Sequence, residues 1–353
     1  MARQGLDLLT QLKKATADIT RLLRLFLALS LLSTSGCAWL DVKQRQLIYR
    51  PTTGVPASFA GLPPGDQRYF LDVAQTAAGK SAPPPESGNG LNERPDPPRI
   101  EMWWLPNKDP AAPTLLYFHG TFRTLVANVR KIEALREAGF SVLAVEYRGW
   151  GLSTPIIPSE KSILQDADMA WAELQKREPR PGMRVIYGHS MGSGVAVDLA
   201  SRQRPQSNYG GLILESAFTS FPDIALEVGR VAWLLAHFSD ERFASGEKIG
   251  LVERPLLMIH GNLDKTVPMN LGEKLFAAAN PPKAWVMIEG GKHSDLDAVG
   301  QAQYQQAVQQ FRALLLQRAT AQPPAPAAPT ASDTPAASNG PVSAGVAAQG
   351  VAR

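Results

Sequence analysis

Short apolar runs rich in β-branched residues recur along most of this chain, and helical patterns fill the intervals between them from the third run onward. Strands that alternate with helices form a mainly parallel sheet, because a parallel pair needs a long crossover and the crossover helix covers one face. The sequence therefore predicts an α/β fold with helices on both faces of the sheet. The runs are Arg68–Val73, Ile100–Leu105, Thr114–Phe118, Ser141–Glu146, Arg184–Tyr187, Gly211–Glu215, Pro255–Ile259 and Trp285–Ile288.

The flanks of this alternating region differ from it in composition. At about 150 residues per domain, 353 residues allow one large domain or two small ones. We assign a single domain to residues 68–320, after an N-terminal extension at residues 38–67. Residues 82–98 hold six prolines and predict a solvated loop between the first two strands, which we expect to pair as an antiparallel edge. Residues 321–353 are rich in Pro, Ala, Ser and Gly and contain no aromatic side chain, so they predict a disordered tail.

The formal net charge of +4 comes from the N-terminus, where residues 1–50 hold eight Lys and Arg against three Asp and Glu. The rest of the chain is nearly neutral, which removes the basic footprint of a nucleic-acid-binding domain. A hydrophobic fraction of 44% and a charged fraction of 19% exclude a fully disordered chain and a multi-span membrane protein. The one cysteine, Cys37, excludes an intrachain disulfide and a Cys-rich metal site. Nothing in the sequence predicts a metal or a cofactor.

Residues 1–37 have the order of an export signal: cationic residues up to Arg24, an apolar run at residues 25–32, then small residues ending in Gly36-Cys37. The apolar run is far shorter than the ~18 residues that span a bilayer as a permanent helix. Gly36-Cys37 resembles a bacterial lipoprotein box, in which the cysteine becomes the lipidated N-terminus, so Cys37 is the candidate lipidation site. An ordinary signal peptide and an uncleaved amphipathic helix are the alternatives.

A Gly-x-Ser-x-Gly motif, Gly188-His189-Ser190-Met191-Gly192, lies between a β-branched strand pattern and a helical pattern. In this setting the serine occupies a strained turn that projects its hydroxyl above the sheet. Side chains two positions before or after it would collide with the neighbouring strand and helix, which favours glycine at both places. Ser190 is therefore the candidate nucleophile.

A serine hydroxyl needs a base, and the base needs an acid that holds it in place. Asp264 lies on the loop after the seventh run and His293 on a glycine-flanked loop after the last run, which gives the chain order Ser, Asp, His. Of the five histidines, His293 is the candidate base, whereas His189 adjoins the serine and is expected to point away from it. Glu215, at the end of the sixth run, is the alternative acid.

Two backbone N–H groups are needed to stabilise the oxyanion of a tetrahedral intermediate. The N–H of Met191, directly after the nucleophile, is one candidate. The loop after the third run supplies the other, for which we predict Thr121, with Phe122 as the alternative.

Six motifs follow one another in the chain: Tyr117–Gly120 (YFHG), Glu146–Ser153 (EYRGWGLS), Gly188–Gly192 (GHSMG), Leu214–Ser220 (LESAFTS), His260–Asp264 (HGNLD) and Gly290–His293 (GGKH). Together they resemble the α/β-hydrolase superfamily, and within it the serine-aminopeptidase-like and depalmitoylase-like (abhydrolase-domain) branch, over about residues 100–316. The resemblance implies an α/β-hydrolase fold with an eight-stranded, mostly parallel sheet and hydrolysis that needs no metal. Where that branch carries His-Gly-Asn and small residues at the oxyanion loop, this chain has the bulkier Thr121-Phe122-Arg123-Thr124.

The segment at residues 216–253 lies where such enzymes carry a short cap. Its amphipathic piece, residues 224–237, predicts either an ordinary helix packed on the sheet or a mobile lid over the acyl site. Four aromatic side chains are candidates either for an apolar acyl or aryl pocket or for the core: Phe122, Trp150, Phe218 and Trp233.

These observations predict a serine esterase or thioesterase that acts on a small-molecule or lipid-like acyl substrate. The alternatives are a serine peptidase or amidase with the same triad, and a non-catalytic lipid-binding or partner-binding protein with the same fold. We expect export, anchoring to the membrane through the N-terminus, and no nucleic-acid partner. With Ala38 rather than an aspartate after the cysteine, the lipoprotein sorting pattern indicates the outer membrane of a two-membrane cell.

Overall fold

The computed structural model describes residues 39–73, 97–237 and 239–321. The predicted export signal with Cys37, nearly all of the proline-rich loop, and the predicted tail apart from its first residue lie outside these ranges.

Eight strands form one sheet in the order β1-β2-β4-β3-β5-β6-β7-β8, which confirms the eight-stranded sheet that the family resemblance implies. Strands β3 to β8 pair in parallel, whereas β2 is antiparallel to both β1 and β4, so the first two runs do form an antiparallel edge. The strands are β1 (Gln67–Asp72), β2 (Arg99–Leu105), β3 (Thr114–Phe118), β4 (Ser141–Glu146), β5 (Arg184–His189), β6 (Gly211–Glu215), β7 (Leu256–Gly261) and β8 (Lys283–Ile288).

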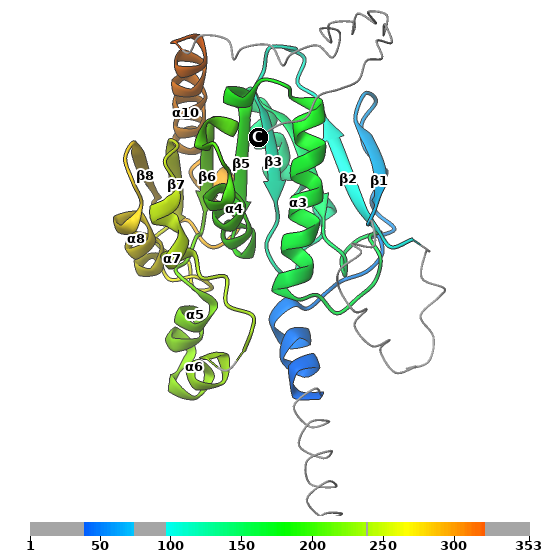
Figure 1. Ribbon diagram of the computed structural model, residues 1–353, viewed down its shortest axis with the longest axis vertical. Coiled ribbons are helices and arrows are strands. Elements are labelled where there is room, and N and C mark those ends of the chain that lie inside the picture. The colour runs from blue at the N-terminus through cyan, green and yellow to red at the C-terminus, as the bar shows by residue number, and fades with distance from the viewer. Residues whose placement is uncertain (1–38, 74–96, 238, 322–353) are drawn as a thin grey trace, which may run out of the picture.

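Helices cover both faces of this sheet (Figure 1). They are the N-terminal helix (residues 39–49), α2 (Val129–Glu137), α3 (Glu160–Arg177), α4 (Met191–Arg202), α5 (Phe221–Val228), α6 (Arg230–His237), α7 (Ser245–Lys248), α8 (Met269–Ala278), α9 (Leu296–Val299) and α10 (Gln301–Ala321), with short 3₁₀ turns at Leu125–Asn128, Pro181–Met183, Gln206–Asn208 and Ile249–Leu251.

Two apolar clusters form the core, one on each face of the sheet. Side chains of α3, α4 and α8 belong to the first cluster, and side chains of α2, α9 and α10 to the second. The division follows the alternation of a strand: Leu116 and Phe118 of β3 join the first cluster, and Leu115 and Tyr117 join the second. Because both faces of β3 are covered, every residue of this strand is buried and the sequence reads as a continuous apolar run.

The carboxyl ends of β5, β6, β7 and β8 lie at one edge of the sheet, because these strands are parallel neighbours. After β6 the chain forms α5 and α6, which project beyond the sheet (Figure 1). Gly229, with φ of 151°, separates these two helices. The single amphipathic piece expected at residues 224–237 is therefore two short helices joined at a glycine.

The N-terminal helix ends at the same edge of the sheet. Tyr49 is fully buried; its ring centroid lies 6.2 Å from that of Trp150 and 6.4 Å from that of Phe221, and its hydroxyl donates to Glu241. Thr53 then forms a bridge with Gly151, on the loop after β4. No helix within the described ranges is both long and apolar enough to cross a membrane.

Candidate active site

Ser190 occupies the turn between β5 and α4 with φ of 54° and ψ of −125°, a backbone conformation that residues other than glycine rarely adopt. The turn leaves no space beside it. A Cβ on Gly188 would lie 2.1 Å from the carbonyl oxygen of Gly192, and a Cβ on Gly192 would lie 2.1 Å from the carbonyl oxygen of Phe118. The glycines of the motif are therefore required by backbone contacts, as the sequence predicts.

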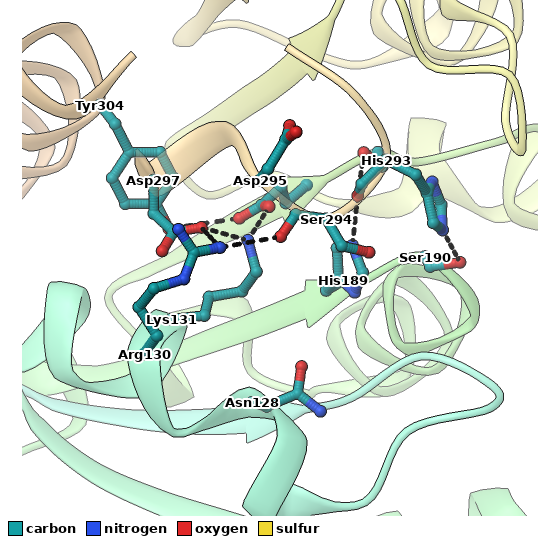
Figure 2. Close-up of polar contacts among 12 residues, drawn as sticks. Asn128, Arg130, Lys131, His189, Ser190, His293, Ser294, Asp295, Asp297 and Tyr304 are labelled. Carbon is teal, nitrogen blue, oxygen red and sulfur yellow. Dashed lines mark hydrogen bonds and ion pairs between the residues drawn. The ribbon is translucent and has the colours of Figure 1, made fainter. Parts of the chain in front are cut away.

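The structure brings Ser190, His293 and Asp264 into one hydrogen-bonded chain. Ser190 Oγ lies 2.9 Å from His293 Nε2 (Figure 2), and His293 Nδ1 lies 2.8 Å from Asp264 Oδ2. The second carboxylate oxygen, Asp264 Oδ1, accepts from the N–H groups of Thr266 and Val267, each at 2.9 Å. With Nδ1–H donating to Asp264, His293 Nε2 is free to accept the proton of the serine hydroxyl.

Asp264 is a buried carboxylate that stays ionised. Burial by itself raises the pKa of its carboxyl, but the hydrogen bond and charge of His293, with the N–H of Val267, outweigh burial, so the pKa is lowered below its usual value. A negative charge next to Nδ1 favours the imidazolium that forms when Nε2 takes a proton.

Glu215, the alternative acid, contacts other partners. Tyr187 donates to Glu215 Oε2 at 2.5 Å and Tyr304 donates to the same oxygen at 3.2 Å, while Lys131 pairs with Oε1. Asp264 therefore makes the contact with His293, whereas the partners of Glu215 are two hydroxyl groups and an ammonium.

The loop after β3 lies against the nucleophile. A Cβ on Gly120 would lie 2.9 Å from the Cβ of Ser190, so the loop passes directly beside it and continues into Thr121. Met191 is the first residue of α4, where backbone N–H groups have no carbonyl of a preceding turn to donate to. Met191 thus follows Ser190 directly in the chain, and Thr121 follows Gly120, whose backbone passes beside Ser190.

The backbone of His293 is held from two neighbouring strands. Its carbonyl oxygen accepts from His189 Nε2 at 2.8 Å (Figure 2) and from Ser216 Oγ at 3.3 Å. Burial, followed by the charges of Lys131 and His293, holds the pKa of His189 well below its usual value, so His189 is neutral and donates through Nε2–H. Neither donor was predicted to have a role from the sequence, although His189 adjoins Ser190 and Ser216 adjoins Glu215.

The four candidate pocket aromatics separate into two groups. Trp150 and Phe218 are fully buried and belong to the core, which is one of the two places predicted for them. Trp233 is half-buried on α6. Phe122 is 46% exposed with φ of 67°, and the guanidinium carbon of Arg50 lies 4.8 Å from the centre of its ring. Phe122 and Arg50 therefore stand together at the exposed side of the loop beside Ser190.

Among the described residues, no three or more His, Cys, Asp and Glu side chains are grouped so as to hold a metal ion. The chemistry that the described site supports is nucleophilic attack by a hydroxyl, with a neighbouring imidazole as base.

Comparison with known proteins gives matches over the region that carries this site. A family model described as serine aminopeptidase, S33, matches residues 109–247. An uncharacterised protein of Mycobacterium tuberculosis is 34% identical over 259 residues, which cover 72% of this chain and 81% of that protein. Lysophosphatidylserine lipase ABHD12 of Danio rerio is 32% identical over 198 residues, which cover 52% of this chain and 51% of that protein.

Among solved structures, an esterase of Pyrococcus furiosus has a TM-score of 0.56 and 16% identity, and the match covers 76% of this chain and 98% of that one. At this identity the likeness concerns the fold.

Proposed function

This chain belongs to the α/β-hydrolase superfamily and is a hydrolase, and from that premise we propose that it cleaves acyl esters or thioesters through an acyl-enzyme on Ser190. The observation that carries the proposal is the hydrogen-bonded chain from Ser190 Oγ through His293 to Asp264, at 2.9 and 2.8 Å. A serine on a strained turn, with a base beside it and the predicted backbone donors on the adjoining segments, supports acyl transfer.

In the proposed reaction, Ser190 Oγ attacks the carbonyl carbon while its proton passes to His293 Nε2. The backbone N–H groups of Met191 and Thr121 donate to the oxyanion of the tetrahedral intermediate. The imidazolium, held by Asp264, returns the proton to the leaving alcohol or thiol, and the acyl group stays on Ser190. Water, deprotonated by His293, then releases the acid by the same steps.

The same triad also serves amide bonds, and the match to a model described as serine aminopeptidase makes a peptidase the second candidate. Esters and thioesters release a better leaving group than an amine, so their cleavage depends less on protonation of the leaving group by the imidazolium of His293. A panel of acyl esters, acyl thioesters and aminoacyl amides, compared by kcat/KM, decides between the two.

The test of the proposed nucleophile is labelling with a fluorophosphonate probe. We expect the wild type to be labelled and to hydrolyse at least one substrate of the panel. Ser190→Ala should lose the label and slow hydrolysis by several orders of magnitude, because no other group in the site supplies the attacking oxygen. Full labelling or unchanged turnover of Ser190→Ala contradicts the assignment, and a wild type that is folded but neither labelled nor active supports a binding protein instead.

We also propose that the protein is exported and anchored through Cys37, with the outer membrane as destination in a two-membrane cell. The sequence order of residues 1–37 supports this. So does the exposure of Trp39 and Leu40, 62% and 54%, at the start of the N-terminal helix, because apolar side chains beside a lipid anchor are covered by the bilayer.

A further inference from the structure

Four charged side chains meet between α2, the end of β6 and the segment that follows His293. Figure 2 shows three of them, Arg130, Lys131 and Asp297. The ammonium of Lys131 pairs with Glu215 and lies 3.3 Å from Asp297 Oδ1. The guanidinium of Arg130 lies 3.3 Å from the same oxygen of Asp297 and donates to the carbonyl oxygen of Ser294. We call Lys131, Glu215 and Asp297 the buried ion cluster.

The buried ion cluster is withdrawn from water. The side chain of Lys131 is 4% exposed, and those of Glu215 and Asp297 are 0% and 1% exposed. Burying such groups costs hydration free energy that their mutual attraction only partly returns, so an apolar cluster of the same volume stabilises a fold about as well. Stability of the fold alone therefore does not account for these three residues.

The buried ion cluster lies next to the segment that carries the base, His293. Asp297 and Ser294 belong to the segment directly after His293, and the carbonyl of His293 accepts from Ser216, which directly follows Glu215. Lys131 thus joins the end of β6 to the segment that carries the base. The carbonyl of His293 is held by His189 and Ser216, and the segment after it is held by the contacts of Asp297 with Lys131 and Arg130.

We propose that Lys131 is a positioning residue: by pairing with Glu215 and Asp297 it holds the segment that presents His293 Nε2 to Ser190. This inference rests on the proposed function. Without the ammonium, Glu215 keeps its two tyrosine donors and Asp297 keeps Arg130, but the two buried carboxylates lose the cation that they share. The uncompensated negative charge then displaces Asp297 and the segment behind His293. The 2.9 Å contact between His293 and Ser190 then loosens, which slows proton transfer and leaves the surfaces that bind the substrate in place.

The experiment replaces Lys131 by methionine, which keeps the length of the side chain and removes its charge. The end-point stoichiometry of fluorophosphonate labelling counts competent sites, and kcat per labelled site is measured with the best soluble ester of the panel. We expect Lys131→Met to lower kcat per labelled site at least tenfold and to leave KM within about twofold. A merely structural role lowers the number of labelled sites and leaves the turnover of each site unchanged.

The matched control is Arg184→Met. Arg184 is also a buried cation, 6% exposed, but it lies at the amino end of β5 and donates to the carbonyl oxygen of Glu178 at 2.7 Å, at the opposite end of the strand from Ser190. We expect this variant to lose thermal stability and to keep the wild-type kcat per labelled site.

A second variant covers the case in which Lys131→Met does not fold. Asp297→Asn removes one partner of the ammonium, and it should lower kcat per labelled site in the same sense. In the Lys131→Met background, if that folds, Asp297→Asn should cause no further loss, because it removes the uncompensated negative charge. Wild-type turnover per site in the folded variants overturns the inference, while an active, labelled wild type keeps the proposed function intact. A wild type that neither labels nor hydrolyses overturns both.

Discussion

Asp264 and Glu215 are both buried carboxylates at strand ends, yet only the first contacts the base. We predict that Asp264→Asn lowers kcat by about 10⁴, because an amide in this place favours the wrong tautomer of the imidazole. Glu215→Gln should cost less than a hundredfold, since it keeps an acceptor for Tyr187 and Tyr304 and weakens only the pairing with Lys131. The two rates are compared after circular dichroism establishes that both variants fold. The opposite ranking assigns the acid to Glu215.

The residues that the sequence identified have local signatures. Ser190 lies in a glycine motif between a strand and a helix, and Asp264 and His293 lie on loops at strand ends in the expected order. His189 and Lys131 carry no such signature. Their partners lie 104 and 84 residues away in the chain, so the contacts exist only once the strands are ordered. A weak signal for Lys131 was present, because a lysine four residues before Leu135 falls on the buried face of α2.

At the scale of elements, an ion pair between Asp166 and Arg148 joins α3 to the loop after β4, and the carboxyl of this pair titrates. Asp166 of α3 is fully buried and accepts from the backbone N–H and the Nε of Arg148. Burial raises the pKa of the Asp166 carboxyl to about 6 against the opposing charge of Arg148. Between pH 4 and 6 the native state therefore keeps a proton that the unfolded state has released, so stability falls as pH rises through this window.

We predict that Asp166→Asn removes this dependence. The wild type should lose on the order of 2 kcal/mol of unfolding free energy from pH 4 to pH 6 relative to the variant. Urea unfolding followed at several pH values measures the difference. The control is Asp168→Asn on the same helix, where the side chain is 51% exposed and pairs with Arg202. Parallel pH curves for the wild type and Asp166→Asn would rule out the linkage.

The strands were predictable because five parallel neighbours, β3 to β7, are buried on both faces and so read as short apolar runs. The ends of the strands were harder to predict. Strand β7 continues through His260 to Gly261, but the polar ring of His260 ends the apolar run one residue earlier. The break between α5 and α6 was missed because the apolar spacing continues across Gly229. Periodicity reports which face is apolar, and it is insensitive to a single residue that turns the backbone.

At the scale of the whole molecule, the proposed anchor makes a prediction about partitioning. With acyl chains on Cys37, at about 0.8 kcal/mol per buried CH₂, the protein should enter the detergent phase of Triton X-114 when expressed in a host with lipoprotein machinery. Cys37→Ser should remain aqueous or unprocessed. Ala38→Ser, which keeps the cysteine, is the control and should partition like the wild type. Wild-type protein recovered in the aqueous phase leaves an ordinary signal peptide or an uncleaved helix.

The contact between Arg50 and Phe122 sets how far this hydrolase can reach. The N-terminal helix spans residues 39–49 and, at about 1.5 Å per residue, is roughly 16 Å long. Its last turn is fixed to the body by Tyr49, and the next residue stacks on the loop beside Ser190. An enzyme tethered at Cys37 would therefore sample a thin layer next to the membrane rather than the surrounding volume. Its substrates would be molecules that enter that layer, and the rate of encounter would scale with their density per unit area.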